Sequence, residues 1–254
     1  MYKYFAKTQF LGKRVFFLSQ CHSTNDEAAK YAKETPDFPE GTTFITSHQT
    51  NGRGQRGNEW ISPAGQNATF SFLLKPKYIP IDQQFDLNII VSLGIRRALR
   101  KFIGNRLKIK WPNDIYVGDK KMGGILIENT LKGNKIESTV VGIGLNVNQS
   151  SFEIDNATSF KLETSKSIEP NEMIENILID LEEVYAFARV NGLVSLKTEY
   201  LNSLYRLNEI SFFESRGVKF TGTIWGVTDS GQLLIKSDHN VTSYDLKEIK
   251  YLND

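Results

Sequence analysis

The sequence predicts an α+β protein, because the helical and the strand patterns occupy separate stretches of the chain. Apolar residues recur at helical spacing in 85–102 and again in 170–190. By contrast, 107–147 is β-rich and broken by turns, and short alternating strands recur from 208 to 251. These patterns predict helices and strands in one large unit, followed by a small β barrel.

The N-terminal part of the chain contains a helix start signal and two predicted strands. Thr24 to Glu27 has the sequence of a capping box, with Thr24 as the N-cap, so we expect a helix that runs to about Glu34. The segments 42–47 and 67–74 are rich in β-branched and aromatic residues and are predicted as strands. The long irregular loop between them is of a kind that is often functional.

The C-terminal part of the chain begins with helices and ends with strands. Pro170 is suited to the first turn of a helix that runs to about Val190, and a second helix is predicted over 193–204. We place a domain boundary near residue 207, which gives a domain of residues 1–207 and a small domain of residues 208–254.

Composition excludes several classes of protein. The 254 residues are 40% hydrophobic and 24% charged, as in a folded domain, and the net charge of +2 is too small to predict binding to nucleic acid or to an anionic membrane. Cys21 is the single cysteine, so no intrachain disulfide forms. Without a signal-peptide pattern or a run of about 18 apolar residues, the sequence predicts a cytoplasmic protein that does not span a membrane.

The loop between the first two predicted strands carries the first candidate motif, Gly-Arg-Gly-Gln-Arg-Gly-Asn-Glu-Trp over 52–60. Its glycines allow close approach of backbone to a ligand, its arginines suit carboxylate or phosphate, and Trp60 offers an apolar face. The alternative is a solvated basic turn. A P-loop is excluded because no Gly-Lys-Ser/Thr follows.

Two further motifs lie in the β-rich segment. Lys-Trp-Pro-Asn-Asp over 110–114 follows a predicted strand, and Lys-Lys-Met-Gly-Gly-Ile-Leu-Ile-Glu over 120–128 places paired glycines inside a strand. A strong turn and a hairpin with two solvated lysines are the respective alternatives. The three histidines are scattered, which argues against a zinc site.

These blocks, in this order, resemble the signature blocks of biotin–protein ligases. Ser-Thr-Asn at 23–25 upstream and Gly-Ile-Gly-Leu-Asn-Val at 142–147 downstream also match that family. The resemblance implies a central mixed β-sheet flanked by helices, as in class II aminoacyl-tRNA synthetases and lipoate ligases, with a C-terminal SH3-like barrel. It implies an enzyme that joins biotin and ATP to form biotinyl-5'-AMP and then transfers biotin to a lysine of a biotin carboxyl carrier protein or domain.

The resemblance also implies roles for individual residues. The implied biotin-binding residues are Ser23, Thr24, Asn25, Gln49, Gly52, Arg53, Gly54, Gln55, Lys121 and Gly124. The implied ATP-binding residues are Arg53, Arg56, Trp60, Lys110, Asn113 and Asn146. Arg53, Lys121 and Asp114 are the implied catalytic residues. Mg²⁺ is expected with ATP, and the metal ligands are left open.

Elementary electrostatics supports this division of roles. Biotin's carboxylate and the triphosphate must meet, and two unit charges about 4 Å apart repel by about 4 kcal/mol at an effective dielectric near 20. Arg53, Lys121 and Mg²⁺ offset that repulsion. In the second step the acceptor lysine must lose a proton, and Asp114 is the candidate that positions it or takes the proton.

Some features separate this chain from other family members or leave alternatives open. Gln55 stands where the family often has an arginine, which shifts retention of the adenylate toward Arg53 and Arg56. Only 22 residues precede Ser23, so we expect a single-function form without a helix-turn-helix domain or sequence-specific DNA binding. A homodimer is possible. The alternatives are a lipoate ligase or related acyltransferase, and a non-enzymatic nucleic-acid binder that stacks bases on tryptophan.

Overall fold

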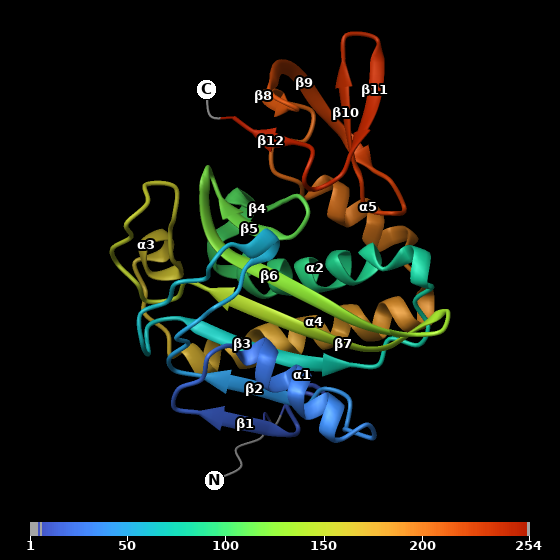
Figure 1. Cartoon of the computed structure of the whole chain (residues 1–254). Helices are drawn as coiled ribbons and strands as arrows, with labels where there is room; N and C mark the ends of the chain where they lie inside the picture. The colour runs from blue at the N-terminus through green and yellow to red at the C-terminus, as the bar shows by residue number, and fades with distance from the viewer. Residues whose placement is uncertain (1–4, 6, 253–254) are drawn as a thin grey trace.

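The computed structural model describes residue 5 and residues 7–252, and most of them belong to one layered unit built on a seven-stranded sheet (Figure 1). The strand order is β1-β2-β3-β7-β6-β5-β4. The β1–β2 pair is parallel and the other neighbours are antiparallel, which confirms the expected mixed sheet. The strands are β1 (Val15–Leu18), β2 (Thr43–Thr46), β3 (Ala68–Leu74), β4 (Leu107–Lys110), β5 (Asp114–Val117), β6 (Lys120–Lys132) and β7 (Lys135–Leu145).

Helices cover both faces of this sheet. In Figure 1 the helix α1 lies in front of the sheet, and α2 and α4 lie behind it. The helices are α1 (Thr24–Glu34), α2 (Phe85–Ile103), α3 (Phe160–Thr164), α4 (Pro170–Asn191) and α5 (Val194–Asn202), with 3-10 turns η1 (Gln55–Gly57), η2 (Ile81–Gln83) and η3 (Gly104–Arg106). Gly94 of α2 lets α4 approach closely, because a Cβ at this position would lie 2.6 Å from the Cα of Leu181.

The predicted elements are confirmed, with one correction at the start of α1. The N-cap is Ser23 rather than Thr24, and its side chain makes no capping hydrogen bond. The capping box does not form, because the backbone N–H of Thr24 donates to Gln49 Oε1 at 2.8 Å. A free backbone N–H of the first helical turn is therefore satisfied by a residue distant in the sequence. The strand β1 and the short helix α3 were not predicted from the sequence.

The C-terminal segment forms a second, five-stranded antiparallel sheet of order β11-β10-β9-β8-β12. Its strands are β8 (Ile210–Ser215), β9 (Val218–Val227), β10 (Leu233–Ser237), β11 (Asn240–Tyr244) and β12 (Lys250–Tyr251). This sheet begins close to the predicted boundary near residue 207. However, Phe213 and Leu233 belong to the same buried apolar cluster as the large sheet, so the two-domain division stays a prediction.

None of the helices in the described ranges is both long and apolar enough to cross a membrane.

Candidate active site

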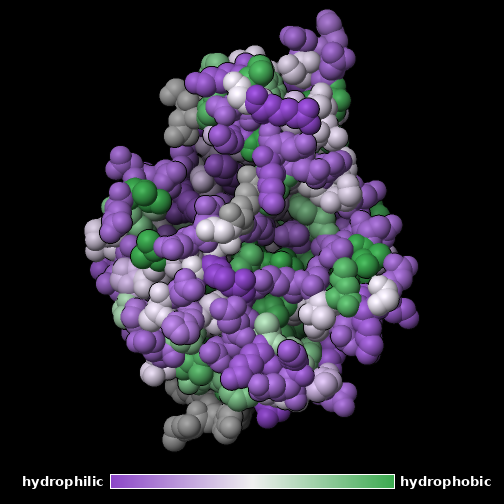
Figure 2. Space-filling view, viewed as in Figure 1, coloured by the Kyte–Doolittle hydropathy of each residue, from purple (hydrophilic) through white to green (hydrophobic). Residues whose placement is uncertain are grey.

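A cavity of about 290 Å³ lies where the large sheet, the loop after β2 and the C-terminal sheet meet. The face shown in Figure 2 is mostly hydrophilic, and it is hollowed below the C-terminal sheet. The structure brings twelve of the predicted residues to the cavity wall: Ser23, Thr24, Asn25, Gln49, Arg53, Gly54, Gln55, Trp60, Lys110, Asp114, Lys121 and Gly124. Segments that are far apart in the sequence therefore form a single site.

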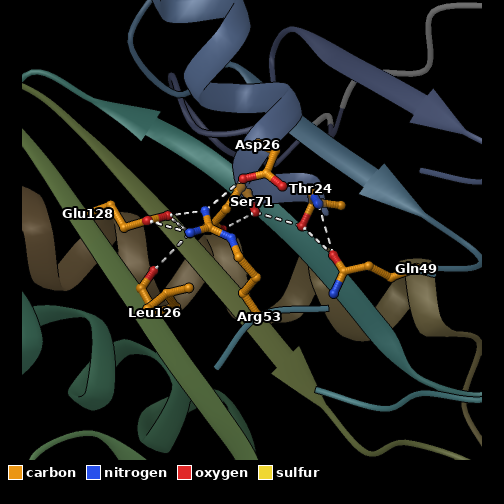
Figure 3. A network of polar contacts seen from close by, with 8 residues as sticks. Thr24, Asp26, Gln49, Arg53, Ser71, Leu126 and Glu128 are labelled. Atoms are coloured by element: carbon orange, nitrogen blue, oxygen red, sulfur yellow. Dashed lines mark hydrogen bonds and ion pairs between the residues drawn. The ribbon is translucent and has the colours of Figure 1, made fainter. Parts of the chain in front are cut away.

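Part of the cavity wall is a network of buried polar groups at the N-terminus of α1, which we call the recess (Figure 3). Gln49 Oε1 accepts the backbone N–H of Thr24 at 2.8 Å. Ser71 Oγ from β3 lies 2.7 Å from Thr24 Oγ1 and 2.6 Å from Asn25 Oδ1. Because these groups already hold one another, the recess has a fixed pattern of donors and acceptors before any ligand enters.

Two glycines of β7 shape the wall beside the recess. A Cβ on Gly142 would lie 2.0 Å from Asn25 Oδ1, and a Cβ on Gly144 would lie 2.3 Å from the indole of Trp60. No real Cβ contact is that short, so neither position accepts a side chain without moving its neighbour. The block at 142–147 therefore contains glycines because neighbouring side chains pack directly against its backbone at the cavity wall.

Arg53 crosses the cavity from the glycine-rich loop and meets two carboxylates (Figure 3). Its Nη1 and Nη2 donate to Glu128 Oε1 and Oε2 at 3.0 and 2.9 Å, a bidentate pair, and its Nη2 lies 2.8 Å from Asp26 Oδ1. The three side chains are 37–50% exposed. A partly exposed guanidinium between two carboxylates is a cation that an anionic ligand can recruit by replacing them.

Lys121 and Asp114 form the second ion pair of the cavity, with Lys121 Nζ 2.8 Å from Asp114 Oδ2. Gly124 lies directly beneath this pair, because a Cβ there would be 3.4 Å from both Asp114 Oδ1 and Lys121 Nζ. The missing side chain leaves backbone and space beside a cation and a carboxylate. This is an arrangement in which a charged group of a ligand can reach both partners.

The two ends of the glycine-rich loop pair with each other beside the cavity. The backbone N–H of Trp60 donates to Gly52 O at 2.8 Å, and a Cβ on Gly52 would lie 2.2 Å from Trp60 O. Gly52 therefore permits the close pairing and does not line the cavity. The indole of Trp60 covers Gly144, and its buried Nε1 has no acceptor among the described residues. A buried donor without a partner at a cavity wall is suited to a ligand atom.

Two residues predicted to contact the nucleotide lie behind the cavity wall instead. Asn113 is 0% exposed, and its Nδ2 donates to Asn88 Oδ1 at 2.8 Å and to Ile125 O at 3.3 Å. Asn146 is also buried and donates to Thr158 O at 3.0 Å. Both amides tie segments together beneath the site, although Asn113 Oδ1 is buried without a partner among the described residues. Contacts of Asn113 and Asn146 with ATP therefore stay a prediction. The side chain of Arg56 lies outside the described part of the chain.

Sequence reasoning did not single out several residues that the fold brings to the site. Asp26, Glu128 and Ser71 engage Arg53, Thr24 and Asn25. Glu128 ends the 120–128 block and Asp26 lies in the 24–27 segment, but neither was given a role, and nothing local marks Ser71. The C-terminal sheet region contributes Leu246, Ile249, Lys250 and Tyr251. Gly142 and Gly144 carried a signal, since both lie in a motif block that was recognised without a role for its glycines.

Comparison with known proteins decides the family. Residues 17–146 match the Biotin/lipoate A/B protein ligase family, a stretch that includes every motif block up to Asn146. The chain belongs to this family. Within it, the bifunctional ligase/repressor BirA of Bacillus spizizenii is 29% identical over 242 residues, which cover 92% of this chain and 73% of the relative. The biotin–[acetyl-CoA-carboxylase] ligase of Paracoccus denitrificans is 29% identical over 86% of this chain and 92% of its own.

A solved structure of this family matches the whole arrangement. The biotin protein ligase of Aquifex aeolicus in complex with biotin and ATP superimposes with a TM-score of 0.79 at 26% identity, over 95% of this chain and 100% of that chain. The likeness therefore extends beyond the catalytic sheet to the C-terminal sheet, and it confirms the expected fold class.

The described residues include no cluster of three or more His, Cys, Asp or Glu side chains that could hold a metal ion. Asp114 is the carboxylate of the cavity that pairs with Lys121. Mg²⁺ in nucleotide sites commonly takes one or two carboxylates and completes its shell with phosphate oxygens and water. The residues present fit such a shared site rather than an all-protein metal cage.

Proposed function

We propose that this protein is an ATP-dependent biotin–protein ligase, which forms biotinyl-5'-AMP and transfers biotin to a lysine of a biotin carboxyl carrier protein or domain. The observation that carries the proposal is one continuous cavity whose wall carries two kinds of polar group. The buried recess at Thr24, Asn25 and Gln49 offers fixed hydrogen bonds to a neutral polar ring. The cationic group of Arg53, Lys121 and Lys110 offers charge to a carboxylate and to phosphates.

In the first step, biotin's carboxylate attacks the α-phosphorus of ATP, and pyrophosphate leaves. Arg53 moves from its carboxylate partners to the ligand's anionic groups, where it offsets the repulsion between them. Lys121, whose Nζ lies 2.8 Å from Asp114 Oδ2, stabilises the same anionic groups. Mg²⁺ bound with ATP supplies further charge neutralisation, and Asp114 is the protein carboxylate that would contribute to its shell. No protein nucleophile takes part.

In the second step, the acceptor lysine attacks the mixed anhydride and AMP leaves. A lysine with a pKa of about 10.4 is mostly protonated at neutral pH. Asp114 lies at the cavity wall and is suited to orient that ammonium group and to accept its proton. The acceptor protein is proposed from the chemistry of the family. A cytoplasmic location, homodimerisation and a lack of sequence-specific DNA binding stay predictions.

The test is biotin-dependent exchange between ATP and radiolabelled pyrophosphate, with lipoate as the matched alternative substrate. We expect exchange with biotin and none with lipoate, because the recess is lined by hydrogen-bonding groups that a dithiolane ring leaves unpaired. Exchange with lipoate alone would move the protein to the lipoate branch of the family. A protein without exchange on either substrate that binds oligonucleotides with steep salt dependence would overturn the ligase proposal.

A further inference from the structure

A lysine ammonium group at the cavity wall is enclosed by three tyrosine rings. Lys110 Nζ lies 4.8 Å from the ring centroid of Tyr116, 4.8 Å from that of Tyr251 and 6.0 Å from that of Tyr205. It also donates a hydrogen bond to the Tyr116 hydroxyl at 3.2 Å. Because the faces of aromatic rings are negative, three rings within about 6 Å attract and orient a cation. We refer to these three tyrosines as the tyrosine cage.

The caged lysine has no carboxylate partner. Among the described residues, no Asp or Glu oxygen lies within ion-pair distance of Lys110, and the nearby Asp114 is paired with Lys121. Burial lowers the pKa of Lys110, and the charge of Asp114 opposes this shift while Lys121 and Arg206 add to it. An ammonium has three N–H donors, and Tyr116 takes one. The remaining donors are available on a residue that lines the cavity.

The cage joins the two sheets. Tyr116 belongs to β5 and Tyr205 follows α5, whereas Tyr251 belongs to β12 of the C-terminal sheet. The hydroxyl of Tyr251 is buried and has no hydrogen-bond partner in the described chain, so the ring is what this residue contributes. The strand is held in place because Arg206 Nη1 donates to Leu252 O at 3.1 Å.

The neighbouring residue is also tied to the C-terminal sheet. Trp111 Nε1 donates to Gly231 O at 3.0 Å in the turn between β9 and β10, and that turn packs against Phe85 of α2. Two consecutive residues at the end of β4 therefore depend on the C-terminal sheet for their placement.

We propose that the tyrosine cage is a positioning device for ATP: it holds the Lys110 ammonium toward the nucleotide's phosphates, and Tyr251 makes that placement depend on the docked C-terminal sheet. The proposal rests on the proposed function, because it takes ATP as the ligand. It gives the C-terminal sheet a part in the first half-reaction without any direct contact between Tyr251 and the reacting atoms.

The experiment compares Tyr251→Phe with Tyr251→Leu in ATP–pyrophosphate exchange, with the KM for ATP and the KM for biotin measured separately. Tyr251→Phe keeps the ring and loses an unpaired hydroxyl, so we expect a KM for ATP within about twofold of wild type. Tyr251→Leu keeps apolar volume and loses the ring, so we expect the KM for ATP to rise about tenfold. The KM for biotin should stay unchanged in both variants.

A matched control and a double-mutant cycle separate positioning from general damage. Trp225 lies in the same sheet, is 56% exposed and contacts Lys236. Trp225→Ala should therefore change neither KM. In a Lys110→Met background, Tyr251→Leu should have no further effect on the KM for ATP, because the group that it positions is gone. Thermal unfolding of each variant checks that it is folded.

Two results would overturn the proposal: equal increases in both KM values with Tyr251→Leu, or full additivity of the two substitutions in the cycle. If wild-type protein gives no exchange with biotin, the proposed function fails. The cage is then tested by calorimetric ATP affinity of the wild type, Tyr251→Leu, Lys110→Met and the double variant. Wild-type protein that binds no ATP would overturn the cage as well.

Discussion

At the recess beneath α1, buried polar groups are bonded to one another, whereas the charged groups of the cavity are partly exposed and form ion pairs. The recess contacts include Ser71, Thr24 and Asn25 at 2.6–2.7 Å, and all three residues are at most 3% exposed. Among the charged groups, Arg53 and its two carboxylates are 37–50% exposed. The recess is a fixed set of donors and acceptors, and the charged groups around Arg53 are exchangeable. Glu128 joins the two regions, because it also accepts a hydrogen bond from Asn25 Nδ2 at 2.7 Å.

The difference has an energetic basis. A buried donor or acceptor that loses its partner costs about 1–3 kcal/mol, so the recess resists change. An exposed ion pair contributes about 0–1 kcal/mol, so the carboxylates around Arg53 are readily replaced by a ligand anion. Shape selectivity is therefore expected from the recess, and charge recruitment from the charged groups around Arg53.

The largest effect is expected where a methyl group enters the recess. Gly142→Ala would place a Cβ 2.0 Å from Asn25 Oδ1 and force this amide from its buried contacts. Overpacking and lost hydrogen bonds together amount to about 3–5 kcal/mol, which corresponds to a loss of biotin affinity of roughly a hundredfold to a few thousandfold. Isothermal titration calorimetry with biotin measures it. Gly226→Ala is the control, because its Cβ would meet nothing closer than 3.8 Å. Equal behaviour of both variants would contradict a rigid recess.

The next effect is expected at the exchangeable cation. Arg53→Ala should lower ATP–pyrophosphate exchange by about two to three orders of magnitude, since it removes a charge that stabilises the reacting anions. The free energy of unfolding should change by less than about 1 kcal/mol, because the ion pairs are exposed. Arg53→Lys retains the charge without the bidentate geometry and should be intermediate. Near-normal pyrophosphate release by Arg53→Ala would refute the role.

A smaller effect is expected for the carboxylate that pairs with Lys121. Asp114→Asn should slow transfer of biotin from the isolated adenylate to an acceptor domain by about one to two orders of magnitude, because the acceptor lysine loses its proton acceptor. Adenylate formation should be less affected. Single-turnover measurements of the two steps separate these outcomes. Equal losses in both steps would limit Asp114 to its contacts with Lys121 and Mg²⁺ and would remove its part in proton transfer.

The smallest effect is expected on stability, at the caged lysine. Burial lowers the pKa of Lys110 in the folded state, so between that pKa and the usual value of about 10.4 the unfolded chain binds more protons. The free energy of unfolding of the wild-type protein therefore rises with pH in that window. Lys110→Met should be the more stable protein at neutral pH, by less than about 2 kcal/mol. Urea unfolding at several pH values should show this advantage shrinking toward pH 10, and a constant difference would contradict a buried charge.

Much of the fold was predictable because its signals are local. The spacing of apolar residues in 85–102 and 170–190 specified α2 and α4, and turn residues divided the β segments. The start of α1 was predicted one residue late, because the backbone N–H of Thr24 is bonded to Gln49 rather than to a local cap. β1 is too short and too uniform in composition to stand out before its parallel partner β2 is known.

The sequence by itself determined the family, the glycine positions and the cations of the site, since each is marked by a motif a few residues long. Only the tertiary structure decided what these residues touch. It paired Arg53 with Glu128, 75 residues away, buried Asn113 behind the wall and brought Tyr251 to Lys110. The physical reason is that backbone preference and periodicity act over one or two turns, whereas the partner of a charge is set by how distant segments pack.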